Sequence, residues 1–254
     1  MTIFYFTATG NSLAVAKQIG GELISIPQVI DSTDLNFKDD AIGIVFPIFW
    51  WNPPFMVRHF IDKFTFEADY LFTIGTYGSI SGGAMSNLRK LANEKGYSFN
   101  YTNQLLMLDN YLPVYEMETQ AKKLAKKDVV GNTAKIVSDI YNRKQMEVKA
   151  NFATKAMTKV VGRRFNPAKN AQKYIVNDKC NNCGICAKVC PSKNITVSSE
   201  VIFSNQCEGC LACLHLCPQN ALHIKNQRSN KRWRNPDTTL AELIEANNRT
   251  GVGD

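Results

Sequence analysis

The cysteines of this 254-residue chain are confined to one short segment. No cysteine precedes position 180, and all eight lie between Cys180 and Cys217. They form two sets with the same spacing, Cys-x2-Cys-x2-Cys-x3-Cys-Pro, and each cysteine of the first set recurs 27 residues later. An apolar triplet follows each set, Ile195–Val197 after the first and Leu222–Ile224 after the second. The segment is therefore an internal duplication of a short unit.

The spacing of these cysteines favours iron–sulfur clusters over zinc or disulfides. Three cysteines at x2 spacing can direct their sulfurs into one loop cavity around a single cluster. Disulfides need an oxidising compartment, and the chain begins without a basic, cleavable signal segment. Zinc sites mostly use paired Cys-x2-Cys units with longer gaps between the pairs. We therefore expect two [4Fe–4S] clusters, with the ligands Cys180, Cys183, Cys186, Cys190, Cys207, Cys210, Cys213 and Cys217.

The first 146 residues show apolar strands alternating with helical stretches. Helical patterns follow the strands, and the last of them is predicted over residues 120–142. This alternation predicts an α/β fold, a doubly wound parallel sheet that is covered on both faces. The predicted strands are Ile3–Phe6, Ala41–Phe46, Tyr70–Ile74 and Gln104–Leu108, and the earlier helices are Leu13–Ile19 and residues 55–64 and 84–95.

The turn after the first strand has the composition of an anion site. Its hydroxyls, its backbone N–H groups and the start of the next helix all favour a phosphate. The chain lacks the Gly-x4-Gly-Lys-Ser/Thr nucleotide loop and has no Gly-x-Gly-x-x-Gly after this strand, so these two nucleotide sites are not supported. The turn resembles the phosphate loop of flavodoxins, T/S-x-T-G-x-T/S, which binds FMN in that family. Its residues are Thr7, Ala8, Thr9, Gly10, Asn11 and Ser12.

The loops after the next strands are expected to hold the flavin ring, because ligands bind at the carboxyl ends of parallel strands. Three consecutive aromatic residues can stack on a flat ring, and we expect at least one of them to contact it while others pack under the loop. A glycine-rich loop can present backbone groups to the ring edge, and its tyrosine either covers the other ring face or packs in the ordinary way. The predicted ring contacts are Pro47, Phe49, Trp50, Trp51, Gly75, Thr76, Tyr77, Gly78 and Asn110.

The whole chain resembles the flavodoxin–ferredoxin fusion proteins of anaerobic bacteria and archaea. The resemblance implies a flavodoxin-like FMN-binding domain at residues 1–146 and a small α+β ferredoxin domain with two [4Fe–4S] clusters at residues 173–226. A basic connector at residues 147–172 and a tail at residues 227–254 complete the chain. The resemblance also implies crossed ligation. One cluster would take Cys180, Cys183, Cys186 and Cys217, and the other Cys207, Cys210, Cys213 and Cys190.

The formal charge of +8 lies entirely after residue 146. Residues 1–146 carry 14 Lys+Arg and 14 Asp+Glu, whereas the remainder carries 16 and 8. A basic balance can indicate nucleic acid, but cluster thiolates and a flavin phosphate would offset much of it. Nucleic acid is therefore not the expected partner. The connector is predicted to be an amphipathic helix packed between the two halves, with membrane or partner binding as the alternative.

These features predict an electron-transfer protein that passes electrons between FMN and two clusters, linking two-electron with one-electron partners. The expected partners are redox proteins, such as a ferredoxin or an oxidoreductase. The alternative is a flavin-dependent reductase of a quinone, nitro compound or enoate, and a third class is a redox sensor that binds nucleic acid. We assign no catalytic acid, base or nucleophile. Because prolines break the longest apolar run, we predict no membrane span and a cytoplasmic location.

Overall fold

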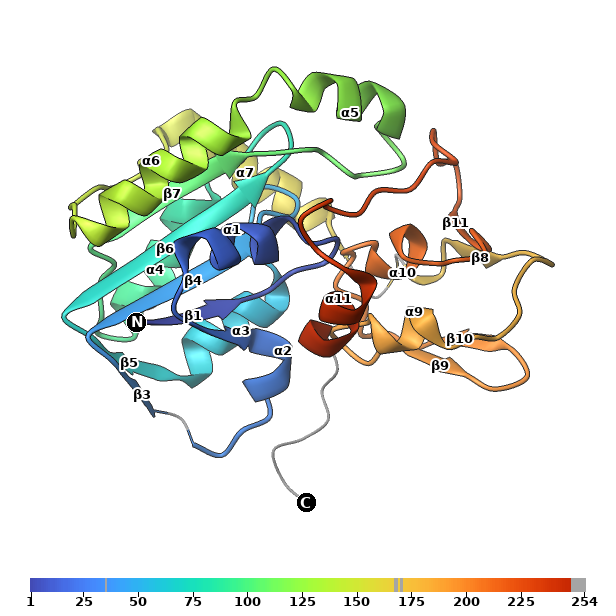
Figure 1. Ribbon diagram of the computed structural model, residues 1–254, viewed down its shortest axis with the longest axis horizontal. Coiled ribbons are helices and arrows are strands. Elements are labelled where there is room, and N and C mark those ends of the chain that lie inside the picture. The colour runs from blue at the N-terminus through green and yellow to red at the C-terminus, as the bar shows by residue number, and fades with distance from the viewer. Residues whose placement is uncertain (35, 167–168, 170, 248–254) are drawn as a thin grey trace.

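A five-stranded parallel sheet forms the centre of the N-terminal half (Figure 1). The computed structural model describes residues 1–34, 36–166, 169 and 171–247. The strand order is β2-β1-β4-β6-β7, which is the flavodoxin-like order 2-1-3-4-5, so the predicted fold class is confirmed. The strands are β1 (Thr2–Tyr5), β2 (Glu22–Ser25), β4 (Ala41–Pro47), β6 (Tyr70–Tyr77) and β7 (Tyr101–Leu106).

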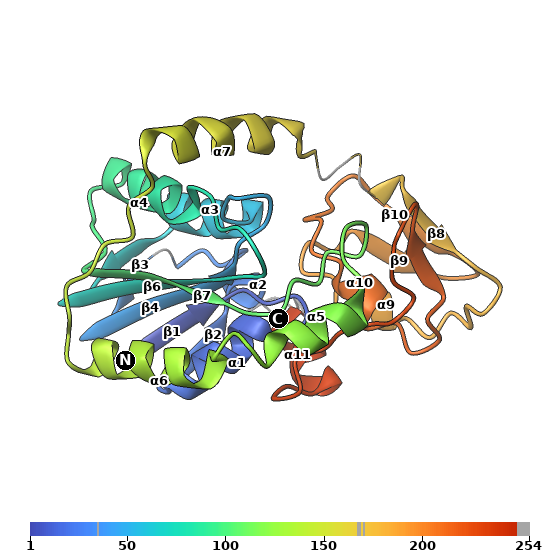
Figure 2. The same ribbon diagram turned by 90° about the horizontal axis from the view of Figure 1, so that it is seen from above.

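Helices cover both faces of this sheet (Figure 2). One face carries α1 (Asn11–Ile19) and α6 (Val129–Tyr141), and the other carries α3 (Phe55–Lys63) and α4 (Ala84–Glu94). The short α2 (Ile26–Val29) packs beside the edge strand. A separate parallel pair is formed by β3 (Asn36–Lys38) and β5 (Thr65–Glu67).

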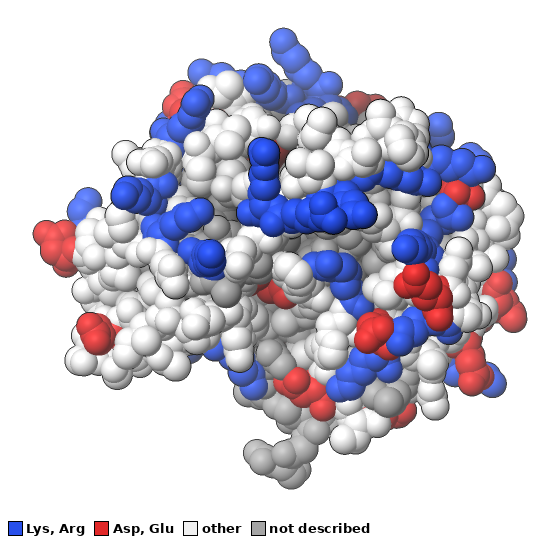
Figure 3. Space-filling model, turned by 180° about the vertical axis from the view of Figure 1, so that it is seen from behind, with Lys and Arg blue, Asp and Glu red and all other residues white. Residues whose placement is uncertain are grey.

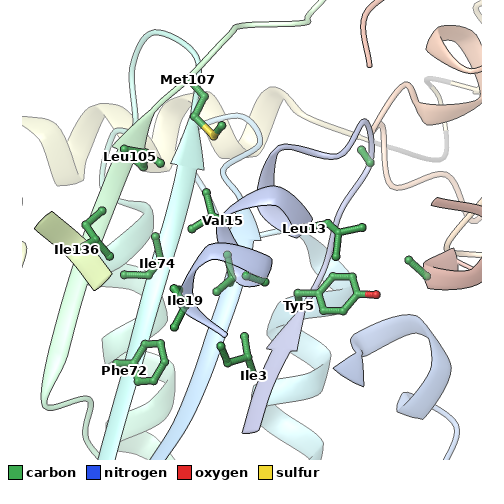
Figure 4. Packing of buried hydrophobic residues seen from close by; sticks show 14 of the residues in the cluster. Ile3, Tyr5, Leu13, Val15, Ile19, Phe72, Ile74, Leu105, Met107 and Ile136 are labelled. Carbon is green, nitrogen blue, oxygen red and sulfur yellow. The ribbon is translucent and has the colours of Figure 1, made fainter. Parts of the chain in front are cut away.

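The two faces of the sheet bury separate apolar clusters, because successive side chains of a strand point to opposite faces. Ile3 of β1 lies with Val15 and Ile136 under α1 and α6 (Figure 4). Phe4, the next residue, packs on the other face against Phe60 of α3. The central strands are thus buried on both sides, which explains their unbroken apolar sequences.

The prediction of one continuous helix over residues 120–142 is wrong. The structure has two helices there, α5 (Met117–Leu124) and α6. Asp128 separates them with a positive φ of 43°, and its carboxylate accepts a hydrogen bond from the Gly131 N–H at 3.2 Å. Asp128 therefore caps a new helix instead of continuing the old one.

The C-terminal half is built from two short antiparallel pairs. β8 (Tyr174–Val176) pairs with β11 (Leu222–Ile224), and β9 (Ile195–Val197) pairs with β10 (Val201–Phe203). The repeated apolar triplets of the sequence are therefore strands of this small α+β unit. Two one-turn helices, α9 (Ile185–Lys188) and α10 (Ala212–His215), begin within the cysteine sets.

The connector contains α7 (Phe152–Arg164), which lies over α3 and α4 (Figure 2). It makes its close contact through a small residue, since the Thr158 hydroxyl accepts a hydrogen bond from the Gly83 N–H at 2.8 Å. The apolar side chains of Phe152, Met157 and Val160 are exposed, whereas those of Val161 and Phe165 are partly buried. Positions 167, 168 and 170 of the connector lie outside the described residues.

The tail returns to the N-terminal half. After β11 the chain crosses back, and α11 (Leu240–Asn247) packs against α2. Glu242 of α11 forms a 2.7 Å ion pair with Lys17 of α1. Residues 248–254 lie outside the described residues. No helix in the described part of the chain has the length and apolar character needed to cross a membrane.

Candidate cofactor sites

The turn between β1 and α1 places several hydroxyls at the N-terminus of a helix. The Ser12 hydroxyl lies 2.9 Å from that of Thr76, and the Thr9 hydroxyl accepts a hydrogen bond from the Asn110 amide at 2.7 Å. The Thr7 hydroxyl oxygen is buried and has no hydrogen-bond partner. A buried polar group without a partner is costly, so this turn suits a ligand that supplies an acceptor or donor.

The C-terminal tail covers the outer side of this turn. The Asn235 N–H donates to the Thr9 carbonyl at 2.8 Å, and the Asn235 amide donates to the Asn11 side-chain oxygen at 3.0 Å. Gly10 has φ +102°, and a Cβ there would lie 2.1 Å from the Thr238 hydroxyl. Gly10 is therefore required by its backbone conformation and by the close approach of the tail.

The three consecutive aromatic residues form a strained turn. Trp50 and Trp51 have φ values of 51° and 63°, and Phe49 and Asn52 exchange backbone hydrogen bonds on either side of them. Two non-glycine residues with positive φ are unfavourable, and such strain concentrates at functional sites. The turn holds the Trp50 ring against Tyr111, with ring centroids 5.1 Å apart and planes at 77°.

These segments surround a cavity of about 330 Å³, which we call the central cavity. Its volume lies at the lower end of the range for small-molecule sites. Gly10 and Gly75 do not line it, because Gly10 faces the tail and Gly75 packs against Ile48 and Met85. The predicted residues that do line it are Thr7, Ala8, Thr9, Asn11, Ser12, Pro47, Phe49, Trp50, Trp51, Thr76, Tyr77, Gly78 and Asn110.

Several lining residues were missed by sequence reasoning. Asp109 is one of them, and burial raises the pKa of its carboxyl, which accepts a hydrogen bond from Ser79 at 2.8 Å. Lys127 donates to the Gly78 carbonyl at 2.7 Å and so supports the glycine loop from behind. The position of Asp109 directly after the fourth predicted strand was the available signal.

The central cavity also has a wall from the C-terminal half. Gly209, Cys210 and Leu211 line it, although they lie about a hundred residues after the last lining strand loop. This wall brings one cysteine of the second set to the edge of the central cavity. It is the one place in the described structure where a cysteine lines the same cavity as the hydroxyl-rich turn.

The eight cysteines line two further small cavities, four to each. The division follows the crossed pattern, in which the fourth cysteine of each set joins the first three of the other. Three members of the second group are at most 9% exposed, whereas Cys183 of the first group is exposed. The first group is Cys180, Cys183, Cys186 and Cys217, and the second is Cys190, Cys207, Cys210 and Cys213.

The environment of these sulfurs disfavours free thiolates. Burial raises the pKa of the Cys186 thiol to about 11 and raises the pKa of Cys210 and Cys213 well above the usual value. Stable thiolates therefore require a nearby positive charge, such as iron. Backbone N–H groups of Gly209 and Ala221 point at the sulfurs of Cys207 and Cys217, each at 3.3 Å, as donors to bound thiolates would.

The described residues contain no group of three or more His, Cys, Asp or Glu side chains placed to hold a single metal ion. Each cysteine group lines a cavity of its own, and four cysteines are the ligand set that a [4Fe–4S] cluster requires.

Two buried side chains join the cysteine segment to the N-terminal half. His215 accepts a hydrogen bond from the Trp233 N–H at Nδ1, so its Nε2–H donates to the Asn110 carbonyl at 2.8 Å. Burial lowers the pKa of His215 to about 4 and keeps the ring neutral. The Glu208 carboxylate accepts hydrogen bonds from the N–H groups of Phe55 and Met56 at the start of α3, at 3.0 and 2.8 Å.

Comparison with known proteins identifies the C-terminal segment. Residues 172–218 match the family described as a 4Fe-4S dicluster domain. No curated protein matches the chain. The chain thus carries a flavodoxin-like domain followed by a ferredoxin domain of the 4Fe-4S type.

Two solved structures are similar to part of the chain. One is a protein of Bacteroides uniformis described as a flavoprotein, with 19% identity, a TM-score of 0.32, and coverage of 49% of this chain and 97% of that one. The other is the two-electron reduced flavodoxin of Megasphaera elsdenii, with 19% identity, a TM-score of 0.28, and coverage of 41% and 83%. With TM-scores this low, the strand order remains the observation that identifies the fold.

Proposed function

We propose that this chain is an electron-transfer protein that binds FMN in the central cavity and one [4Fe–4S] cluster in each cysteine cavity. One observation carries the proposal: the wall of the central cavity includes Cys210 and its neighbours. A flavin in that cavity would lie beside a cluster ligand with no intervening layer of protein. Such proximity serves electron transfer, whereas two unrelated binding sites would not require it.

The residues of the central cavity fit FMN at both ends. The phosphate would be held by the N-terminus of α1 and by the buried, unpartnered hydroxyl of Thr7. The ring would lie among the aromatic turn and Tyr77, and Trp50 is the residue that we expect to cover it. Phe49, Trp51, Tyr111 and Asp109 complete the lining and exclude water from the ring.

The burial of the two cysteine groups supports an order of electron flow. The group of Cys190, Cys207, Cys210 and Cys213 adjoins the central cavity and is mostly buried. The other group includes the exposed Cys183. We infer that a soluble one-electron partner exchanges electrons at the outer cluster, and that the inner cluster connects it to the flavin. FMN exchanges two electrons and each cluster one, so the chain links the two kinds of chemistry.

Cofactor analysis of protein purified without oxygen tests this proposal. We expect about eight iron, eight acid-labile sulfide and one FMN per chain, from the ligand count. A one-electron donor should reduce the same fraction of the FMN in the presence and in the absence of a quinone. A well-folded protein with full iron content but no FMN would contradict the flavin assignment. Sustained turnover of a quinone, nitro compound or enoate would instead favour a reductase.

A further inference from the structure

A second cavity, of about 440 Å³, lies between α3, α4 and α7, and we call it the basic groove. Trp50 separates it from the central cavity and lines both. Figure 3 views the face that carries α7 and shows Lys and Arg side chains gathered across it, with few acids among them. The cations that line the groove are Arg58 of α3, Lys90 of α4, and Lys155, Lys159 and Arg163 of α7.

The positive charge of the groove is only partly balanced by acids of the described residues, since Lys90 pairs with Glu94 at 3.7 Å and Glu208 lies near Arg58. Lys155, Lys159 and Arg163 are spaced four residues apart, so they share one face of α7, where like charges destabilise a helix. Neither these three nor Arg58 forms an ion pair with an acid of the described residues. Glu208 is the only acid in the described lining, and both its oxygens are engaged by backbone N–H groups of α3. A bound anion would relieve this repulsion.

One donor in the groove is buried without a partner. The Nε of Arg58 is inaccessible and makes no hydrogen bond, while its guanidinium lies 4.1 Å from the centre of the Phe55 ring. A buried, unpaired donor of a charged group is costly unless a ligand supplies an acceptor. Arg58 therefore gives the groove a partly buried cation, which exposed lysines alone would not provide.

The groove also offers aromatic surface. Phe165 lies nearly parallel to Phe55, with centroids 6.2 Å apart and planes at 16°, and to Trp50, at 5.0 Å and 22°. Both phenylalanines line the groove, and Phe55 is 41% exposed. The groove thus presents aromatic side chains beside cations that suit phosphate oxygens.

We propose that the basic groove binds a nucleotide-like ligand, in which a planar aromatic ring is joined to two or more phosphates. The α7 cations extend over about 12 Å, at 1.5 Å per residue, so they match an extended anion better than a single ion. The volume is in the range of small-molecule sites. A docking protein would cover the outer face of α7, whereas these residues line a hollow. None of them is a cysteine, and the groove shares only Phe49 and Trp50 with the central cavity.

Calorimetric titration of the holoprotein with ADP tests the proposal. We expect ADP to bind, and the variant Lys155→Gln/Lys159→Gln to bind it at least tenfold more weakly. The control Lys126→Gln/Lys135→Gln removes the same charge from exposed lysines outside the groove, and it should leave the affinity unchanged. Iron and FMN content should be equal in all three proteins.

The ring contact is tested separately with Phe165→Leu. This variant should weaken binding of ADP while leaving that of inorganic pyrophosphate unchanged. The proposal is overturned if ADP does not bind at millimolar concentration, or if the control variant loses as much affinity as the groove variant. A third outcome would overturn it in favour of a protein interface. In that outcome the native protein does not bind ADP, and the variant Lys155→Gln/Lys159→Gln loses its affinity for an acidic redox protein.

Discussion

The hydroxyl of Thr7 is the residue-scale feature that most directly tests the flavin site. It is buried in the turn before α1 and has no hydrogen-bond partner among the described residues. A hydrogen bond to a charged group contributes about 1.5–3 kcal/mol. We expect Thr7→Val, which keeps the shape and removes the hydroxyl, to raise the dissociation constant for FMN at least tenfold. Quenching of flavin fluorescence measures this constant.

The matched control for Thr7→Val is Thr73→Val. Thr73 is also fully buried, but its hydroxyl donates to the Ile44 carbonyl within the sheet. Its loss should lower the free energy of unfolding and leave FMN affinity unchanged. If Thr7→Val binds FMN as tightly as the native protein, the phosphate is not held by this turn as proposed.

The fourth cysteine of each set decides between crossed and uncrossed ligation. Cys190 lies with Cys207, Cys210 and Cys213, and Cys217 lies in the other group. We expect Cys190→Ser to perturb the inner cluster, whose neighbour is the flavin, and to slow electron transfer between cluster and flavin. EPR of the reduced protein, together with iron analysis, identifies the affected cluster.

Cys217→Ser serves as the comparison for Cys190→Ser, because it changes the equivalent position of the repeat. It should disturb the outer cluster and leave the inner cluster's EPR signal intact. The opposite assignment, with Cys190→Ser perturbing the outer cluster, would contradict crossed ligation.

At the scale of elements, the sequence predicted what is repeated, periodic or chemically distinctive. The cysteine sets, the central strands and the turn at residues 7–12 follow from local spacing and apolar runs. The aromatic turn was identified from three adjacent rings, but its positive φ values at Trp50 and Trp51 were not, since tertiary contacts impose them. The edge strand β2 was missed because its residues are half-exposed and lack a buried-strand pattern.

The failures of prediction have physical causes as well. Residues 120–142 read as one helix because the apolar spacing continues across Asp128, whose capping role is visible only in the structure. The connector was expected to be an amphipathic helix packed between the two halves, but its close contact through Thr158 with the small residues Gly82 and Gly83 has no sequence signal. The packing of the tail on the phosphate turn has no local sequence signal.

The tail helix α11 is held partly by the ion pair between Glu242 and Lys17, and this contact predicts a pH dependence. Hydrogen bonds to Lys17 and Thr239 lower the pKa of Glu242 to about 2. Because the pKa of Glu242 is lower in the folded state, its ionised form stabilises the fold at pH values above the ordinary carboxyl pKa near 4.5. This stabilisation is lost as the pH falls toward 2. Because the pair is partly exposed, we expect only about 0.5 kcal/mol.

Hydrogen exchange of α11 amides, corrected for intrinsic rates, measures this effect. Glu242→Gln should reduce protection at pH 6, and the difference from the native protein should shrink below pH 4. Glu245→Gln is the control on the same helix, because Glu245 forms no ion pair with the described residues. A difference that stays the same between pH 6 and pH 2 would assign the stabilisation to packing instead of charge.

At the scale of the whole molecule, the two halves are joined by buried contacts that a sequence cannot reveal. Leu108 and Leu112 of the N-terminal half share an apolar cluster with Leu214 and Cys213 of the other. His215 adds a hydrogen bond from between two cysteine ligands to the loop after β7. His215 therefore fixes the cysteine loop against the central cavity.

Glu208 provides the sharpest test of this coupling between the halves. Its buried carboxylate, whose pKa burial raises to about 7, accepts two backbone N–H groups of α3 while Cys207 beside it belongs to the inner group. Glu208→Ala leaves those two donors without a partner and removes this connection. We expect electron transfer between flavin and inner cluster to slow at least tenfold, because covalent linkage alone maintains proximity but not a fixed distance. Flash reduction followed by absorbance measures the rate.

Two comparisons separate this effect from loss of a cofactor or of the fold. Glu208→Gln keeps an acceptor for α3 and should recover part of the rate, whereas Glu200→Ala, at an exposed glutamate of the same half, should change nothing. Iron and FMN content must match the native protein in all variants. If Glu208→Ala retains both cofactors and the native transfer rate, the link to α3 does not set the distance between flavin and inner cluster. The fixed spacing would then come from the apolar cluster around Leu108 and from the His215 hydrogen bond.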